Sequence, residues 1–366
     1  MLGWPTCRAG NTIHNEDMVM DDARSGDATT DAVVSAALHR RAEHRAVFDT
    51  TLQEVFLSQR VQLRDPIGSL SKETVVYGGV YEGQDVAVKV FTMAADDIRD
   101  TIGAYGAFKI ECEKTMILSR RSEHIVQVLE YGDAELPEDM PEEMRQFFPL
   151  GIVPFMITER APYGSLDGVI KRYHHLPGFD RLSLLEAVAK ATDGIREAHD
   201  HHVAHRDIKP QNILVFDPAT AKIADFGIAR WRSRIQREDA VMLTPRYCSP
   251  EQAFYALTGR REGLVGIKGD VYSWAVMVYE VLTGKHPFAW VTQHLRPGAS
   301  GQQAMLKAVA ANDRRGFVPT GDITFDSLIA SCTADFHQRT EDITIANRVL
   351  RQLIGRLKME DNGPAE

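Results

Sequence analysis

The sequence has few cysteines and no long apolar run. Its four cysteines, Cys7, Cys112, Cys248 and Cys332, lie far apart and form no CxxC pair, which argues against a zinc site and against a disulfide framework. No stretch approaches the roughly 18 consecutive apolar residues of a membrane-spanning helix. Residues 1–16 also lack the apolar segment of a signal peptide. We therefore expect a cytoplasmic protein without membrane contact.

An excess of positive charge is also absent. The formal net charge is -9, whereas proteins that bind nucleic acid usually carry a basic face, so no nucleic-acid partner is expected. Of the 366 residues, 44% are hydrophobic and 25% are charged, which is typical of a globular protein. That length is enough for one large domain or two modest ones.

Hydrophobic patterning divides the chain at about residue 65. Residues 1–28 are polar with little periodicity, which predicts disorder. Over residues 29–64 apolar side chains recur at threes and fours without Pro or Gly, and this pattern predicts a long helix in an extension of residues 29–65. The extension is expected to brace the following domain, to inhibit its site or to bind a regulatory partner.

Beyond this point the patterns predict strands first and helices later. Alternation over residues 74–90 predicts a hairpin around a Gly83-Gln84 turn. A helix over 108–119 and strands over 125–131 and 152–158 are expected next. The acidic stretch 133–148 is interpreted as a surface insertion and a second candidate for contact with a regulatory partner. Later helical periods cover residues 182–202, 271–283, 302–311, 325–332 and 344–358.

Two short segments carry the chemistry: residues 205–212, which read HRDIKPQN, and Asp225-Phe226-Gly227. Transfer of a phosphoryl group spreads negative charge over its oxygens, so an enzyme must supply cations and hold the acceptor hydroxyl in line. Asp225 and Asn212 offer a carboxylate and an amide oxygen, which suit Mg²⁺. Asp207 is then left for the acceptor.

The pattern HRDxKxxN followed by DFG resembles the eukaryotic-type (Hanks-type) Ser/Thr protein kinase superfamily. The resemblance covers about residues 70–355. It implies an α+β, bilobal fold with a small antiparallel β lobe containing one major helix, a larger and mainly α-helical lobe, and ATP between them. We expect the kinase domain over residues 66–355, with its small lobe to about 158, a hinge at 159–163 and a large lobe over 164–355. Residues 356–366 form a C-terminal tail.

The same resemblance assigns catalytic roles. Asp207 would orient or deprotonate the acceptor hydroxyl, and Lys209 would face the moving phosphate. Thr244, in the segment LTPRYCSPE, would bridge these two residues. Asn212 and Asp225 would hold Mg²⁺ or Mn²⁺ for ATP. In the family, lysine at position 209 marks kinases that act on serine or threonine.

Nucleotide binding is expected around Lys89, which ends the VAVK run that resembles the family's VAIK strand. Alone, a lysine after a buried strand is more often the point where the strand meets solvent. Glu113 is its expected partner, aiming it at the phosphates, and Glu111 is the alternative. Adenine is expected to contact the hinge at Thr158, a small gatekeeper, and at the backbone of Glu159 and Ala161.

The glycine-rich loop that covers phosphates in the family, GxGxxGxV, is incomplete. With Val80 as the final valine, only Gly78 matches, and Glu73 and Val75 stand in place of the first two glycines. Glycine lets backbone N–H groups approach phosphates closely. We therefore expect a stiffer loop and weaker or unusual nucleotide binding.

Further matches concern the scaffold and regulation. Glu251 is expected to pair with Arg339, and Asp270 to cap the catalytic loop. Arg206 pairs with a phosphate in the family, and Glu238 or Asp239 is the hypothetical substitute here, so that activity would not need phosphorylation; a solvated acidic turn is the alternative. The cluster of His199, His201, His202 and His205 is interpreted as the end of a helix and an anchor of the loop rather than as a metal site.

These observations predict a serine/threonine protein kinase that transfers the gamma phosphate of ATP to a protein substrate. Two alternatives remain open. A pseudokinase or signalling scaffold would explain the eroded glycine loop, although the intact residues Lys89, Asp207, Asn212 and Asp225 oppose it. A kinase for small molecules is opposed by Ser249-Pro250-Glu251, which belongs to a peptide-docking segment in the family.

Overall fold

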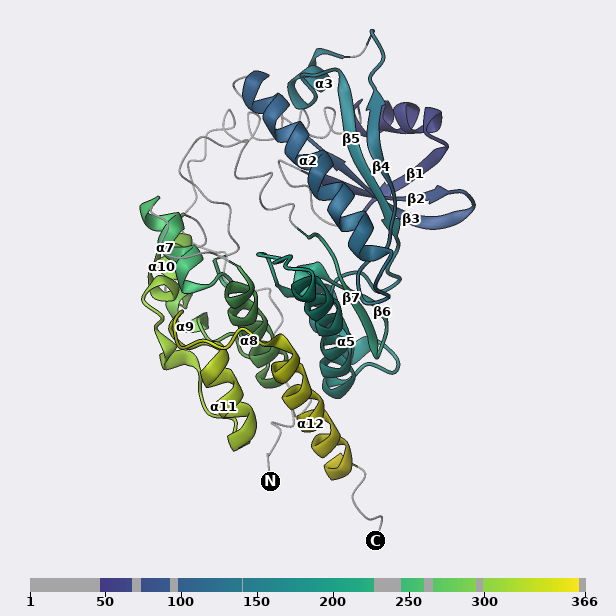
Figure 1. Ribbon diagram of the computed structural model, residues 1–366. Coiled ribbons are helices and arrows are strands. Elements are labelled where there is room, and N and C mark those ends of the chain that lie inside the picture. Colours follow the sequence, from purple (N-terminus) through teal and green to yellow (C-terminus); the bar gives the residue numbers. More distant parts are fainter. Residues whose placement is uncertain are drawn as a thin grey trace, which may run out of the picture.

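The computed structural model shows two lobes (Figure 1). The small lobe is built on a five-stranded antiparallel sheet, and the large lobe is mainly helical. This is the predicted α+β architecture. The structure describes residues 47–67, 74–92, 98–139, 141–226, 245–259, 266–293 and 299–361.

The small-lobe sheet has the strand order β1-β2-β3-β5-β4. The predicted hairpin is confirmed as β2 and β3, with its turn at Glu82 and Gly83, one residue earlier than expected. Both turn residues have positive φ, 49° and 78°, as a two-residue hairpin turn of the right twist requires. The strands are β1 (Val61–Pro66), β2 (Thr74–Tyr81), β3 (Gln84–Phe91), β4 (Val128–Glu135) and β5 (Ile152–Glu159).

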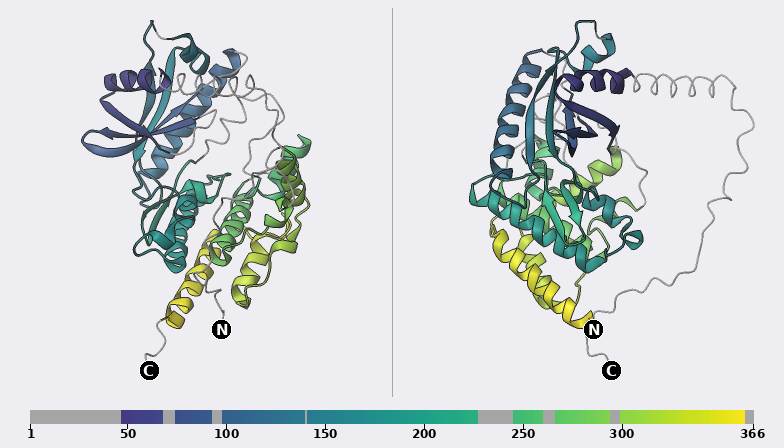
Figure 2. Two further views of the ribbon diagram at one scale, coloured as in Figure 1. Left: turned by 180° about the vertical axis from the view of Figure 1, so that it is seen from behind. Right: turned by 90° about the vertical axis from the view of Figure 1, so that its right-hand side faces the viewer.

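Side chains alternate between the two faces of the sheet because successive residues of a strand point to opposite sides. On β3, Val86, Val88 and Val90 belong to one buried cluster, whereas Phe91 belongs to another with Phe108 of α2 (Ile98–Ser119). The first cluster also contains residues of a helix that includes residues 47–58. The sheet therefore lies between α2 and this N-terminal helix (Figure 2).

The N-terminal helix ends earlier than predicted. It was expected to continue to residue 64, but it ends at residue 58, and Arg60 has a left-handed backbone with φ 60°. Val61 and Leu63 are buried while Gln62 and Arg64 are exposed, so the period of the apolar residues changes from helical to alternating at this point. Residues 61–66 consequently pair with β2 as the edge strand β1.

The described part of the N-terminal helix is an integral part of the small-lobe core. Leu52 and Phe56 are fully buried, and the Phe56 and Phe155 rings meet edge to face at 5.1 Å. The Tyr77 hydroxyl on β2 donates a hydrogen bond of 2.5 Å to Asp49 Oδ1. We infer that this part of the extension braces the sheet, which was one of the three roles expected for it.

Leu52→Ala is expected to lower the free energy of unfolding by about 3 kcal/mol, because it leaves a cavity between helix and sheet. Urea denaturation would measure the change. Gln53→Ala on the exposed face of the same helix is the control and should have little effect. Equal stability of the two variants would show that the helix does not stabilise the lobe.

The acidic stretch 133–148 is only partly a surface insertion. Its first residues continue β4 to Glu135, and its end forms the short helix α3 (Glu142–Phe147). Met144 and Phe148 are buried in the same cluster as the N-terminal helix, where Phe148 stacks on Phe48 at 6.0 Å. The insertion and the extension, the two segments expected to meet regulatory partners, therefore pack against each other.

The large lobe is organised around α5 (Arg181–Asp200) and α8 (Ile267–Thr283), which are lined with buried residues of one core. The five predicted helices are confirmed, with ends that differ by at most four residues. None of the helices in the described ranges is both long enough and apolar enough to cross a membrane. The remaining elements are α4 (Leu166–Ile170), β6 (Ile213–Asp217), β7 (Thr220–Ile223), α7 (Pro250–Thr258), α9 (Ala289–Thr292), α10 (Ala299–Ala310), α11 (Ile323–Cys332), α12 (Ile343–Asp361) and three short 3₁₀ turns at Tyr173–His175, Pro210–Asn212 and Arg314–Gly316.

Candidate active site

The segment between α5 and β6 brings three of the predicted site residues together. Asn212, in the 3₁₀ turn Pro210–Asn212, donates from Nδ2 to the backbone oxygen of Asp207 at 2.7 Å and to its Oδ2 at 3.1 Å. Lys209 Nζ lies 2.7 Å from the same Oδ2. The Asp207 carboxylate is thus held by two neighbouring side chains. The Asp207 side chain is still 19% exposed, which leaves it open to an acceptor.

Asp270, in the first turn of α8, supports this loop from the large-lobe core. Its side chain is almost fully buried and accepts hydrogen bonds from the amides of His205 at 2.7 Å and Arg206 at 2.6 Å. The predicted capping role is thus confirmed. His199 Nε2 lies 2.9 Å from Asp270 Oδ2, a contact that no sequence pattern predicts. His199 and His205 are therefore scaffold residues of the loop, while His202 lies exposed beyond the end of α5.

Asp225 follows β7 and lies opposite Lys89 of β3. Lys89 Nζ is 2.6 Å from Asp225 Oδ1, and the Lys89 side chain is only 12% exposed. The Ala224 amide donates to the Asn212 carbonyl at 2.8 Å, and His205 Nε2 lies 2.7 Å from the Ala224 carbonyl. The structure therefore brings together the two predicted segments, one with Asn212 and the other with Asp225. The lysine brings the small lobe into this site.

The expected pair between Lys89 and Glu113 is not formed in this structure. Glu113 is exposed on α2, while the neighbouring side chains of Cys112 and Thr115 are buried. Since successive helical residues are 100° apart, these buried neighbours fix the rotation of the helix and turn Glu113 outward. Thr115 Oγ1 instead donates to the Phe226 carbonyl at 3.3 Å. The side chain of the alternative partner, Glu111, lies outside the description.

The three predicted hinge residues lie at the end of β5 and just beyond it. Thr158 pairs with Ala87 of β3, and the Ala161 carbonyl accepts a hydrogen bond from the Gly164 amide at 3.2 Å. Within the described part of the chain, the Ala161 amide donates to no backbone carbonyl. An N–H group that is to donate to adenine must not already be used in this way. Glu159 has a further role that sequence reasoning missed, because its side chain holds the lobes together.

The Glu159 carboxylate binds Lys222 Nζ of β7 at 2.7 and 2.8 Å. It also accepts the amide of Gln127, which precedes β4, at 2.7 Å. Both charged side chains are about four-fifths buried, at 19% and 23% exposure. The hinge is therefore tied by one carboxylate to the strand that leads to Asp225.

Lys222→Met is expected to destabilise the protein by about 1 to 3 kcal/mol, because it removes the charged hydrogen-bond partner of a largely buried carboxylate. Lys222→Arg should retain most of the stability. Thermal and urea unfolding would measure both, with Lys190→Met on the exposed face of α5 as the control. If Lys222→Met unfolds like the control, the tie does not stabilise the hinge.

Gly78 and Val80 do not form a phosphate-covering loop, which corrects the sequence assignment. Both lie within β2, where they pair with Ala87 and Asp85 of β3. A loop that binds phosphates needs backbone N–H groups that are not used in a ladder, and these residues are part of one. The connection between β1 and β2 at residues 67–73, which contains Gly68 in the sequence, is the remaining candidate, and residues 68–73 lie outside the description.

The segment that begins at Pro245 is fixed to the large lobe. The Tyr247 hydroxyl donates to Glu280 Oε2 at 2.5 Å, and burial, together with this carboxylate, raises the pKa of Tyr247. The His286 ring meets Tyr247 edge to face at 5.2 Å. Burial, and to a lesser extent the charge of Arg246, lowers the pKa of His286 to about 3. At neutral pH the Tyr247 hydroxyl is therefore protonated and the His286 imidazole is neutral.

The expected Glu251–Arg339 pair is confirmed. Arg339 Nη1 and Nη2 lie 2.7 and 3.2 Å from the two Glu251 carboxylate oxygens, and the side chains are 0% and 5% exposed. From the next residue, Gln252 Nε2 donates to the Arg206 carbonyl at 2.9 Å. The helix α7 is thus joined to the catalytic loop. Four residues with predicted roles lie outside the described ranges: Gly227, Glu238, Asp239 and Thr244.

Comparison with known proteins agrees with this geometry. The chain is 32% identical over 260 residues to the serine/threonine-protein kinase PknB of Mycolicibacterium smegmatis. This match covers 66% of the present chain and 36% of that relative. The chain is 32% identical over 303 residues to PknB of Mycobacterium tuberculosis H37Rv, with 74% and 42% covered, and 31% identical over 185 residues to PknL of the same strain, with 50% and 42% covered. The chain thus spans less than half the length of these relatives. The protein kinase domain family matches residues 67–344, and the chain belongs to this family.

Proposed function

We propose that this chain transfers the gamma phosphate of ATP to serine or threonine hydroxyls of proteins. The observation that carries the proposal is the convergence of Lys209 and Asn212 on the Asp207 carboxylate within hydrogen-bonding distance. Asp225 follows a segment that is hydrogen-bonded to Asn212. Family membership implies the use of ATP, a divalent cation and a protein substrate. The preference for serine and threonine is supported by the names of the relatives.

Asp207 would act on the acceptor hydroxyl. Its Oδ2 is held by Lys209 and Asn212, which fixes the carboxylate in one orientation before a substrate binds. A hydroxyl that donates to this carboxylate is oriented for attack and can lose its proton to it. Lys209, beside it, places a positive charge where the transferred phosphate gains negative charge.

Asn212 and Asp225 fit a divalent metal ion. The Asn212 amide nitrogen donates both of its bonds to Asp207, so the amide oxygen is the atom that remains for a ligand. The Asp225 side chain is 33% exposed, and the preceding residue, Ala224, donates its amide to the Asn212 carbonyl at 2.8 Å. Oxygen donors of this kind suit Mg²⁺, with Mn²⁺ as the alternative. A bound cation would neutralise charge on the phosphates.

Lys89 is proposed to contact the phosphates of ATP. In the structure its charge is balanced by Asp225 at 2.6 Å, so each of these two groups has an opposite charge nearby before nucleotide and metal bind. Exchange of this pair for phosphate and metal contacts keeps both charges paired, which avoids leaving a buried charge uncompensated. Glu113 would reach Lys89 only after α2 turned about its axis, and its role stays a prediction.

Incubation with ATP labelled in the gamma phosphate, magnesium and casein tests the proposal. Phosphoserine or phosphothreonine in casein, without phosphotyrosine, is the expected product. Titration of magnesium and manganese in the same assay tests the metal preference. Tight ATP binding without transfer to casein or to the chain itself would instead favour a scaffold.

A further inference from the structure

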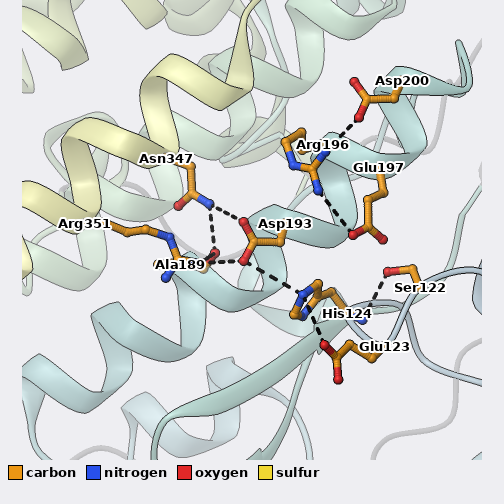
Figure 3. A network of polar contacts seen from close by, with 10 residues as sticks. All are labelled: Ser122, Glu123, His124, Ala189, Asp193, Arg196, Glu197, Asp200, Asn347 and Arg351. Carbon is orange, nitrogen blue, oxygen red and sulfur yellow. Dashed lines mark hydrogen bonds and ion pairs between the residues drawn. The ribbon is translucent and has the colours of Figure 1, made fainter.

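The C-terminal helix α12 contacts the catalytic scaffold although the family match ends at residue 344, near the start of this helix. Two of its side chains converge on one carboxylate of α5 (Figure 3). Asn347 Nδ2 donates to Asp193 Oδ1 at 2.9 Å, and Arg351 Nη2 donates to Asp193 Oδ2 at 2.5 Å. Both also donate to the Ala189 carbonyl, at 3.0 and 3.2 Å. Asn347 is 4% exposed, so this contact is built into the packing of the helix.

Asp193 also faces the segment that joins α2 to β4. His124 Nε2, from this segment, lies 4.0 Å from Asp193 Oδ2. The next residue of α5, Gly194, lets the same segment approach closely, since a Cβ at this position would lie 2.5 Å from the His124 carbonyl oxygen. The backbone of His124 therefore packs directly against α5 at Gly194, and its imidazole lies near the Asp193 carboxylate.

The segment held in this way is bonded to the strand that precedes Asp225. The Ile223 amide donates to the His124 carbonyl at 3.0 Å, and the Val126 amide donates to the Ile223 carbonyl at 2.9 Å. Ile223 is the last residue of β7 and stands two residues before Asp225. The position of the segment at His124 thus determines where the end of β7 lies.

We propose that α12 is a positioning element of the catalytic centre, in which Asn347 and Arg351 fix Asp193, and Asp193 fixes the His124 segment that holds the end of β7 and Asp225. The inference rests on the proposed role of Asp225 as a metal ligand. It assigns to the C-terminal helix an effect on metal binding at a site that the helix does not touch.

The test uses Asn347→Ala and Arg351→Met in the full chain. The Mg²⁺ concentration for half-maximal activity is expected to rise about threefold to tenfold in each, which lies within the range for mutations that act through an intervening network. Arg351→Lys keeps a donor and should restore much of the wild-type value. Arg348→Met, exposed on the same helix, is the matched control and should not change it. Arg351 is itself 45% exposed, so its variants are expected to fold.

Hydrogen exchange without metal or nucleotide gives a second readout. Faster deuterium uptake in residues 122–127 and 220–226 of both variants, but not of Arg348→Met, is expected. Unchanged uptake in these two segments would overturn the inference. A metal requirement that rises equally in Arg348→Met would do the same. If Asp207→Asn retained full activity, the proposed function would fail, and the exchange data would still decide whether α12 positions β7.

Discussion

Asp207→Asn is expected to reduce kcat by about 10²- to 10⁴-fold, the usual contribution of a positioned acid or base. The affinity for ATP should change little, because Asp207 is proposed to contact the acceptor hydroxyl rather than the nucleotide. Asparagine keeps the size of the side chain but cannot accept the proton. Initial rates with labelled ATP would give kcat, and calorimetric titration with ATP would give the affinity.

The control for this variant is Asp200→Asn. Asp200 is 61% exposed and pairs with Arg196 on the surface of α5, where an ion pair contributes little. The activity and melting temperature of the Asp200→Asn variant should match those of the wild type. Asp207→Asn with at least a tenth of wild-type kcat would show that Asp207 is not the group that acts on the acceptor.

Arg339→Met is expected to lower the free energy of unfolding by about 3 to 5 kcal/mol, because it leaves the Glu251 carboxylate buried without its partner. Both side chains are almost completely buried, so water cannot replace the lost guanidinium. Because Gln252 ties the same helix to the catalytic loop, activity should fall at temperatures below the unfolding transition. Urea denaturation and assays at several temperatures would measure these effects.

A double variant separates the cost of a buried charge from the loss of packing. Arg339→Met with Glu251→Gln removes both charges and should recover part of the lost stability. Arg348→Met, which removes an exposed arginine of α12, should have little effect. The prediction fails if Arg339→Met is as stable as that control, or if the double variant is less stable than Arg339→Met alone.

The catalytic loop could be predicted from the sequence because its geometry depends on a few neighbouring residues. Asp207, Lys209 and Asn212 lie within six positions of one another, and a single 3₁₀ turn brings them together. Asp270 and Arg339 could also be placed, since the order of segments in the family implied their partners. Alternating apolar residues predicted β2 and β3, and helical periods predicted α5, α8 and α12.

Other features depend on long-range packing, which local patterns do not contain. The sequence around the β2 glycines resembles a loop, and only their pairing with β3 shows that they belong to a strand. The direction of Glu113 depends on the rotation of α2, which the burial of Cys112 and Thr115 determines. The tie between Glu159 and Lys222 joins residues 63 positions apart. The end of the N-terminal helix was misplaced because one left-handed residue, Arg60, changes the period of the apolar side chains.

The strand β1 has a practical consequence for any shortened form of the protein. A chain cut to the family match would begin at residue 67 and would lose β1 together with the helix that covers the valines of β3. Strand β2 would then become an open edge with unpaired N–H and C=O groups beside an uncovered apolar face, a combination that favours edge-to-edge aggregation. Poor yield of such a fragment would therefore reflect a sheet missing its first strand, and a start before residue 47 would keep the sheet closed on that side.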